Sequence, residues 1–292
     1  LSINIESYGE FERILEVSKE LNKKVNCALR VNPDIAIGSH KYIQTGSKTS
    51  KFGLDKESAL KISSQCEVDG PIKLTSVASH IGSQISDENL ILESVDYLIE
   101  IADELAKNGH NIEYLDIGGG LGIQYRDEEE GSPKILLEKV KELLSERDFK
   151  IILEPGRSVI GTAGILVSKV EYIKEAGEKK FAIIDAGMND LIRPSLYEAW
   201  HKVIEVNHKN TDLDLYDLAG PVCETGDVLA KDRNLKIMPG DHVAFMDVGA
   251  YGSVMTSNYN SRLRPIELLV TKDKVQVIKR KESFEDIVAL ET

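Results

Sequence analysis

The chain has 292 residues, of which 41% are hydrophobic, and its formal net charge is -13. This length suffices for one large or two medium domains, and the hydrophobic content supplies a core and argues against disorder. The negative charge argues against a nucleic-acid partner or an anionic membrane surface, and no apolar run approaches the roughly 18 residues of a membrane span.

Cysteine usage points to a reducing environment. Cys27, Cys66 and Cys223 cannot all pair, and their spacing fits no zinc motif, so no metal site is expected. The N-terminal residues lack the basic and apolar regions of a secretory signal. We therefore expect a cytoplasmic protein.

The first half of the chain alternates strand-like and helix-like segments. Short apolar runs predict strands over residues 2–6, 25–31, 74–80, 114–117 and 150–153. Helical spacing of apolar residues, with caps and end residues such as Asp55, Gly109 and Pro133, predicts helices over 8–21, 56–64, 89–107 and 133–144. This βα alternation favours a parallel sheet, and specifically five strands of a (β/α)8 TIM-type barrel, whose active-site groups lie at the C-terminal strand ends.

The pattern changes near residue 163. Segments 164–173, 181–185, 242–245 and 268–270 read as strands joined by turns, without long helices between them. We expect an α/β plus β protein with two domains. Residues 1–162 would form part of a barrel, and residues 163–292 a C-terminal, mainly β domain.

Two strands end in sequences suited to binding anions. LDIGGGLG (115–122) runs from a strand into three glycines, whose backbone amides can close on a phosphate, although a plain tight turn is an equal alternative. EPGR (154–157) places Glu154 and Arg157 at the end of another strand. Arg157 can hold a phosphate or carboxylate, and Glu154, if buried, can pair with a protonated ring nitrogen, but a simple ion pair explains the motif as well.

A third strand end, SHIGSQ (79–84), carries His80 and Ser83. A single histidine is more often a core residue than a catalyst. The presence of two other polar strand ends at the same edge of the predicted barrel favours a functional role.

The second half contributes candidate substrate-binding and proton-donor residues. Arg193 and Tyr197 lie in RPSLYEAWH (193–201), and Tyr251 and Tyr259 in AYGSVMTSNYNSRLRP (250–265). Arginine with tyrosine suits recognition of a distal carboxylate, although a surface strand with aromatic packing is the simpler alternative. Cys223-Glu224 follows Gly220-Pro221 in an expected loop. The thiol could transfer a proton and the carboxylate could bind an ammonium group, but an ordinary half-buried cysteine is the more frequent case.

The order of these motifs strongly resembles the diaminopimelate decarboxylase family, pyridoxal-phosphate enzymes with the alanine-racemase-like type III fold. The resemblance extends from residue 2 to the end of the chain. The segments that carry it are RVNPD (30–34), TGSKTSKFGL (45–54), SHIGSQI (79–85), LDIGGGLG, EPGRSV (154–159), DAGMNDLIRPSLY (185–197), GPVCETGD (220–227) and GAYGSVMTSNYNSRLRP (249–265).

The resemblance implies a role for each candidate residue in the decarboxylation of meso-2,6-diaminopimelate to L-lysine and CO2. His80 would stack on the pyridine ring of pyridoxal 5'-phosphate, and Glu154 would keep its nitrogen protonated. The cofactor phosphate would be surrounded by Ser83, Gly119, Gly120, Gly156, Arg157 and Tyr251. The substrate would be held by Arg157, Arg193, Tyr197, Glu224 and Tyr251. Cys223 would supply the proton, and its loop would reach the active site of the other subunit of a homodimer.

The sequence departs from the family pattern in one large respect. The family's Schiff-base lysine lies on the first barrel strand in a YAxKAN-like segment, and Lys23, Lys24, Lys48 and Lys51 lie in no such context. We expect the strands present to be barrel strands four to eight, with the first three βα units absent. The chain as given should then leave apolar barrel surface open and turn over slowly, if at all. A smaller departure is Ala78, where the family usually has a histidine.

Three other interpretations stay open at this stage. One is another type III decarboxylase acting on ornithine, arginine or carboxynorspermidine, although the arginine suited to a distal carboxylate, Arg193, favours diaminopimelate. The second is a non-catalytic, partner-binding relative. The third is an incomplete or artificial gene product.

Overall fold

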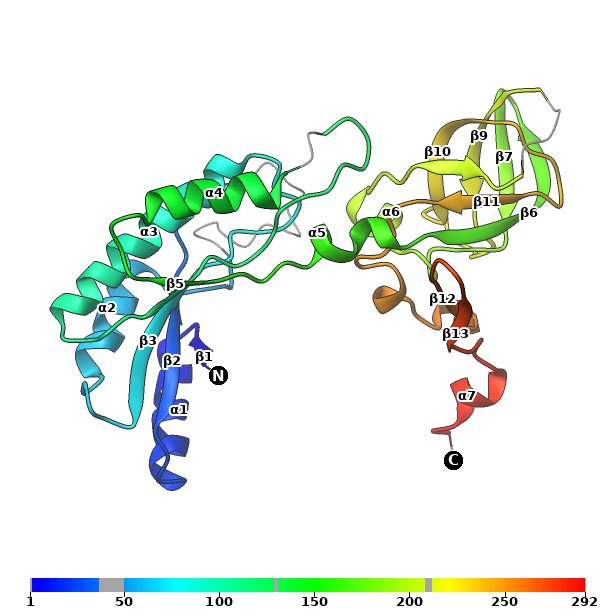
Figure 1. Cartoon of the computed structure of the whole chain (residues 1–292). Coiled ribbons are helices and arrows are strands. Elements are labelled where there is room, and N and C mark those ends of the chain that lie inside the picture. The colour runs from blue at the N-terminus through cyan, green and yellow to red at the C-terminus, as the bar shows by residue number, and fades with distance from the viewer. Residues whose placement is uncertain (1, 37–49, 129–130, 208–211, 292) are drawn as a thin grey trace. The chain divides into compact units, whose positions relative to one another are not determined.

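The computed structural model describes residues 2–36, 50–128, 131–207 and 212–291. It divides into two compact units, Leu1–Gln124 with Glu128–Val159 and Tyr125–Asp127 with Ile160–Thr292 (Figure 1). Residues 45–49 of the TGSKTSKFGL motif, including Lys48, lie outside the described residues. Within the described part of the chain, no helix has both the length and the apolar character needed to cross a bilayer.

A five-stranded parallel sheet organises the first unit, and its strand order β1-β2-β3-β4-β5 follows the chain. The strands are β1 (Ile3–Ile5), β2 (Val25–Arg30), β3 (Ile72–Ala78), β4 (Tyr114–Asp116) and β5 (Lys150–Ile152). The helices are α1 (Tyr8–Glu20), α2 (Lys56–Gln65), α3 (Glu88–Lys107) and α4 (Pro133–Leu143). All nine agree with the predicted elements to within two residues at each end.

Local sequence explains where these helices begin and end. The Asp55 side chain accepts a hydrogen bond from the Ser58 amide at 2.7 Å at the start of α2, and Ser132 caps α4 just before Pro133. Gly109 follows the end of α3 with φ +87°, a left-handed conformation that glycine adopts without strain. The caps identified in the sequence therefore set the helix boundaries.

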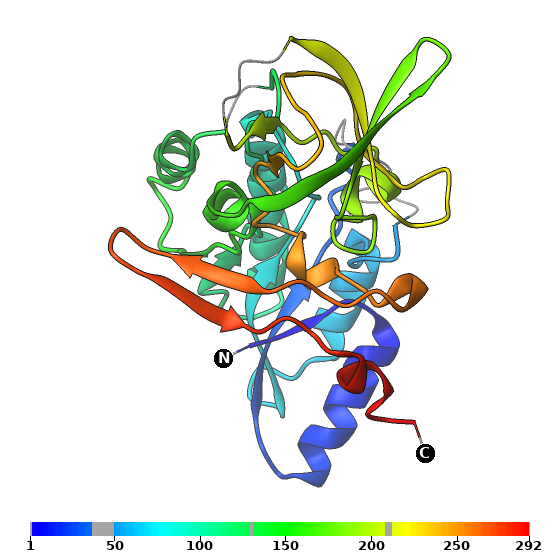
Figure 2. The same cartoon turned by 90° about the vertical axis from the view of Figure 1, so that its right-hand side faces the viewer.

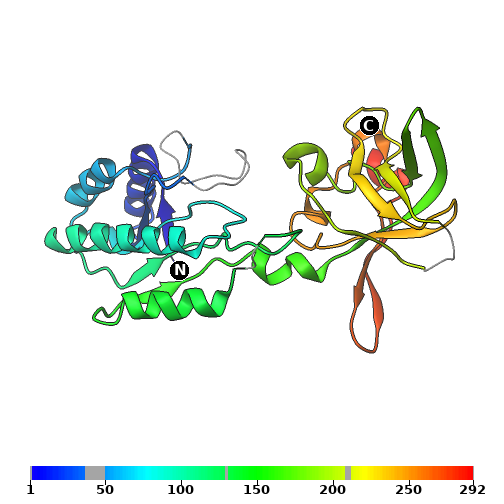
Figure 3. The same ribbon diagram turned by 90° about the horizontal axis from the view of Figure 1, so that it is seen from above.

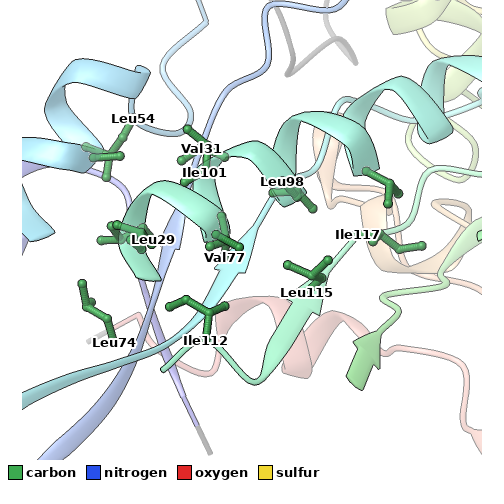
Figure 4. Close-up of a cluster of buried hydrophobic side chains, with 14 of the residues drawn as sticks. Leu29, Val31, Leu54, Leu74, Val77, Leu98, Ile101, Ile112, Leu115 and Ile117 are labelled. Carbon is green, nitrogen blue, oxygen red and sulfur yellow. The ribbon is translucent and has the colours of Figure 1, made fainter. Parts of the chain in front are cut away.

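All four helices cover the same face of this sheet. Parallel strands paired in chain order require each crossover to pass over one face, because such crossovers are right-handed. A single buried cluster joins strands and helices. Figure 4 shows Leu98 and Ile101 of α3 near Val77 and Leu115 of the sheet. Helices α3 and α4 contact each other and run alongside one another (Figure 3). This one-sided winding is typical of barrel-type α/β folds and differs from doubly wound sheets.

The second unit is mainly β. Its mixed six-stranded sheet has the order β10-β9-β7-β6-β11-β8, and β12 and β13 form a separate antiparallel hairpin, orange to red in Figure 2. The strands are β6 (Leu166–Ala176), β7 (Lys179–Ile184), β8 (Val203–Glu205), β9 (Asp214–Ala219), β10 (Val228–Leu235), β11 (His242–Phe245), β12 (Glu267–Val270) and β13 (Val275–Lys279). The sheet packs on its own core, which includes Val170, Leu218 and Phe245.

Two features of the second unit were not expected. Strands β8, β9, β10 and β13 were not predicted, because their short, mixed polar segments show no clear alternation. The interpretation of RPSLYEAWH as a surface strand is wrong, because Arg193–Tyr197 forms the short helix α6. Pro194 fits the first turn of this helix, where a backbone N–H has no helical partner in any case. A further short helix, α7, spans Phe284–Val288.

Candidate functional site

Polar side chains gather at the C-terminal ends of the first unit's strands. Strand residues alternate between the two sheet faces, so Leu29 and Leu115 enter the core while Arg30 and Asp116 lie on the face without helices. A cavity of about 130 Å³, called here the inner-face cavity, is lined by Asn4, Arg30, Ala78, Ser79, His80, Asp116 and Glu154. Two predicted site residues, His80 and Glu154, therefore meet in one cavity. The expectation that Glu154 is buried is wrong: this residue is exposed, because the backbone after β5 leaves the sheet here.

The glycine turn after β4 holds the ring of His80. The backbone N–H of Gly119 donates to Nδ1 of His80 at 3.2 Å. Since Nδ1 accepts this bond, the proton of the neutral imidazole lies on Nε2. Burial and the positive charge of Arg30 lower the pKa of His80, and Glu154 opposes this shift. His80 is thus held as a neutral ring with one defined tautomer.

Asp116 lies directly before this turn and is 7% exposed. Its Oδ1 accepts a hydrogen bond from the Gly118 amide at 3.0 Å. Burial raises the pKa of Asp116 to about 6. Glu154 adds to the shift, while the Gly118 amide and Arg30 oppose it. Arg30 forms an ion pair with Glu6 at 2.5 Å, and the cavity lining places two further carboxyl groups, those of Asp116 and Glu154, with this arginine.

The glycines of LDIGGGLG permit close backbone contacts that no other residue allows. A Cβ on Gly119 would lie 2.0 Å from the carbonyl oxygen of Glu154. A Cβ on Gly120, where φ is +93°, would lie 2.1 Å from the carbonyl oxygen of Gly82. The three motifs SHIGSQ, LDIGGGLG and EPGR are therefore packed backbone against backbone.

Arg157 completes this group. It is 5% exposed, and its Nε and Nη2 donate to Oγ of Ser83 at 3.4 and 3.2 Å. Ser83, Gly119, Gly120 and Arg157 thus belong to segments that meet at one sheet edge, and Gly156 directly precedes Arg157, the first residue of the short helix α5 (Arg157–Ile160). A buried guanidinium, a hydroxyl and glycine amides form the donor set that suits a phosphate group.

In the second unit, Cys223 and Glu224 lie on a short loop between β9 and β10. Both are exposed, and Glu224 accepts a hydrogen bond from the hydroxyl of Tyr259. Asp227, which is 2% exposed, closes the loop. Its carboxylate accepts hydrogen bonds from the amides of Met188 and Val222, both at 2.6 Å.

Arg193 is buried, at 6% exposed, at the start of α6. Its Nη1 lies 2.8 Å from Nε2 of His201, and its guanidinium carbon lies 4.8 Å from the centroid of the Tyr125 ring. Tyr197 lies at the other end of α6 and is half-buried. The predicted carboxylate-binding pair therefore lies on one helical turn.

Tyr251, in the GAYG motif, is 43% exposed and has φ +58°, a left-handed conformation that is costly for a tyrosine. Arg262 links the nearby motifs, because its Nε donates to Oδ1 of Asn189 at 2.8 Å and its Nη2 to the Asp185 carbonyl at 2.6 Å. Asp185 and Arg262 also line a cavity of about 420 Å³ in this unit, whose described lining includes none of the predicted site residues.

The sequence interpretation missed several residues that organise these groups. Arg30, Asp116, His201 and Asp227 received no role, although Asp116 lies two residues before the first glycine of LDIGGGLG and Asp227 closes the GPVCETGD motif. Their positions at or near the edges of the motifs could have identified them as residues that organise the site. Their hydrogen-bond partners, however, come from segments up to 45 residues away, as with His201 and Met246.

Comparison with known proteins first shows the class of enzyme to which the chain is related. Residues 2–161 match the family described as "Pyridoxal-dependent decarboxylase, pyridoxal binding domain". Among curated proteins, the diaminopimelate decarboxylases of Aquifex aeolicus and Pseudomonas aeruginosa are each 43% identical to the chain over 99% of its length, and it spans 69% and 70% of those proteins.

Solved structures give the same family as the sequence comparisons. A diaminopimelate decarboxylase from Helicobacter pylori, complexed with L-lysine, superposes with a TM-score of 0.94 at 38% identity, covering 99% of this chain and 72% of that one. The chain belongs to the diaminopimelate decarboxylase family. An arginine decarboxylase of Paramecium bursaria Chlorella virus, at 19% identity and a TM-score of 0.76, shares the fold alone.

Proposed function

We propose that this chain catalyses the pyridoxal-phosphate-dependent decarboxylation of meso-2,6-diaminopimelate to L-lysine and CO2, as a cytoplasmic enzyme of lysine biosynthesis. The observation that carries the proposal is the 43% identity to diaminopimelate decarboxylases over 99% of the chain, with the family's motifs at the strand ends. The five strands of the first unit would be strands four to eight of the barrel, and residues 1–162 its cofactor-binding part. Residues 163–292 would carry the substrate and proton-donor loops.

The residues at the sheet edge fit the cofactor. The absence of side chains at Gly119 and Gly120 lets the glycine turn pack against the backbone of Glu154 and Gly82, and the buried Arg157 supplies positive charge beside Ser83. Gly156 and Tyr251 would complete the phosphate site. When bound, the pyridine ring would draw off the electron pair of the breaking carbon–carbon bond.

His80 and Glu154 would act on the ring itself. The imidazole of His80 is held by the Gly119 amide and is kept neutral by burial, so it can stack on the ring without repelling a protonated nitrogen. The carboxylate of Glu154 would accept a hydrogen bond from that nitrogen and keep it protonated. Both side chains line the inner-face cavity, so both could contact a ring bound there.

Residues of the second unit would hold the substrate and deliver the proton. Arg193 and Tyr197, with Arg157, would bind the carboxylate at the non-reacting end, and Tyr251 would add a further contact to the substrate. Glu224, oriented by Tyr259, would bind the ammonium group there. The bond from the α-carbon to the departing carboxylate breaks, CO2 leaves, and the Sγ–H of Cys223 donates its proton to that α-carbon.

A substrate profile tests the proposal. Protein that spans the full length of the relatives is loaded with pyridoxal phosphate, and CO2 release is measured with meso-diaminopimelate, L-ornithine, L-arginine and carboxynorspermidine. We expect turnover of meso-diaminopimelate alone, because Arg193 suits a distal carboxylate. Faster release from ornithine, arginine or carboxynorspermidine would indicate a different type III decarboxylase, and no release from any substrate would indicate a non-catalytic relative.

Substitution at the proton donor gives a second test. Cys223→Ala should bind cofactor normally and lose most of its lysine production, whereas Cys66→Ser, which alters a buried cysteine at the end of α2, should keep its turnover. We also propose a homodimer in which the Cys223 loop serves the partner's active site. Mixing Cys223→Ala with His80→Ala protein should then restore activity that neither has alone.

A further inference from the structure

His201 is completely buried, with 0% exposure, and it joins two backbone segments of the second unit. It lies just before β8, and Val203 of β8 pairs with Phe245 of β11. This pairing brings His201 beside Met246, whose carbonyl oxygen lies 2.9 Å from Nδ1 of the imidazole. The sheet therefore fixes where the ring can lie.

The chemistry of the two contacts fixes the tautomer. A guanidinium can only donate hydrogen bonds, so Nε2 of His201 must accept from Nη1 of Arg193, 2.8 Å away. The ring proton is then on Nδ1, which donates to the Met246 carbonyl. A protonated imidazole has no acceptor atom, so the bond to Arg193 exists only with the neutral ring.

A second neutral group holds the same guanidinium. The Tyr125 ring lies 4.8 Å from the Arg193 guanidinium carbon and packs edge-on against the His201 ring at an interplanar angle of 85°. Neither contact neutralises the arginine's charge. Together they restrict the plane of the guanidinium, and a fixed plane is what bidentate binding of a carboxylate requires.

We propose that His201 is a positioning residue that orients Arg193 for the distal carboxylate of the substrate, and so helps to restrict the enzyme to substrates that carry this group. The inference rests on the proposed function, in which Arg193 binds that carboxylate. The alternative is that His201 only stabilises the β8–β11 pair.

Two ligands that differ by the carboxylate separate these roles. L-lysine, the proposed product, keeps the distal carboxylate, and 1,5-diaminopentane is the same molecule without it. Binding of each to the cofactor-loaded, full-length protein is measured by calorimetry, so the readout does not depend on turnover. A substitution that only destabilises the fold should reduce the affinity for both ligands.

Two substitutions separate the two hydrogen bonds of the ring. His201→Gln places an amide oxygen near the former Nε2 and can still accept from Arg193. His201→Asn retains only a donor near the Met246 carbonyl. We expect His201→Asn to weaken L-lysine binding about tenfold, as for one hydrogen bond to a charged group, and to leave 1,5-diaminopentane unchanged. His201→Gln should retain most of the affinity for L-lysine.

A double variant gives an independent measure. If His201 acts through Arg193, then Arg193→Gln with His201→Asn should bind L-lysine no more weakly than Arg193→Gln alone. Equal losses for both ligands, an unchanged L-lysine affinity in His201→Asn, or additive losses in the double variant would overturn the proposal. Failure of the wild-type enzyme to decarboxylate diaminopimelate would instead refute the proposed function.

Discussion

The carboxylate of Asp227 accepts a hydrogen bond from the backbone N–H of Val222 at 2.6 Å, directly before Cys223. A Cβ on Gly220 would lie 2.4 Å from the same carboxylate, so the chain can approach Asp227 only because residue 220 is glycine. The buried carboxylate thus sets the backbone of the proposed proton-donor loop.

The first prediction concerns this carboxylate. Asp227→Asn replaces one acceptor oxygen with an N–H donor that faces a backbone N–H, so one of the two loop hydrogen bonds is lost. We expect the free energy of unfolding to fall by about 2 kcal/mol, the cost of a buried hydrogen bond to a charged group. The rate of Cys223-dependent proton transfer should fall as well, because the loop is displaced.

Urea unfolding and the kcat for diaminopimelate measure these two effects. Asp273→Asn is the matched control, since Asp273 lies exposed in the β12–β13 turn and should change neither quantity. Equal behaviour of the two variants would show that Asp227 does not position the loop.

The second prediction compares two glycines that have nearly the same positive φ angle. Gly120 has φ +93° and a Cβ there would meet the Gly82 carbonyl oxygen at 2.1 Å, whereas Gly240 has φ +90° and nothing within 4 Å. Alanine at either position should cost about 1 kcal/mol of backbone strain. Gly120→Ala should in addition displace the glycine turn and weaken cofactor binding at least tenfold.

Cofactor titration followed by absorbance, together with thermal unfolding, tests this difference. The Gly240→Ala variant should bind cofactor like the wild type, with only a modest drop in Tm. Normal cofactor affinity in Gly120→Ala would contradict the assignment of this turn to the phosphate site.

The third prediction is a pH dependence set by Asp116. Its pKa is about 6 in the folded protein, above the ordinary value of 3.8, so the folded state binds the proton more tightly than the unfolded state. The free energy of unfolding should therefore decrease by about 2 kcal/mol as pH rises from about 4 to about 6. Above pH 6 it should change little. Asp116→Asn keeps an acceptor for the Gly118 amide and removes the titration.

Unfolding free energies of the wild type and Asp116→Asn are compared from pH 4 to pH 8. Other acids with a raised pKa, such as the buried Asp190 and the half-buried Asp247, titrate in both proteins, so their contributions cancel in the difference. The variant should gain stability relative to the wild type as pH rises. A difference that does not change with pH would show that Asp116 has an ordinary pKa.

The fourth prediction concerns thiol reactivity. Burial raises the pKa of Cys27 to about 12 and that of Cys66 to about 11, so both stay protonated at pH 8, while Cys223 is exposed. Because the thiolate is the reactive form, iodoacetamide should modify Cys223 alone in the native protein. Peptide mass spectrometry should find all three modified after denaturation in urea. Native modification of Cys27 or Cys66 would contradict their burial.

The sequence by itself determined the parallel half of the fold. Long apolar stripes such as that of α3, with Asp55, Gly109 and Pro133 at helix ends, specify helices through contacts a few residues apart. Alternation of these helices with short apolar strands then specified parallel pairing in chain order. The same local reasoning failed for β8 and β9, because short strands in a mixed sheet take their conformation from partners far along the chain.

Only the tertiary structure decided how the candidate residues are held. The sequence identified His80, Glu154, Arg157, Arg193 and Cys223 as residue types suited to this chemistry. It did not show that the Gly119 amide fixes the tautomer of His80, or that His201 contacts Arg193. These contacts join segments that meet only after the sheets form, and hydrogen bonds act over about 3 Å whatever the separation in sequence. Residue chemistry is therefore readable from the chain, whereas orientation, burial and the resulting pKa values depend on the folded packing.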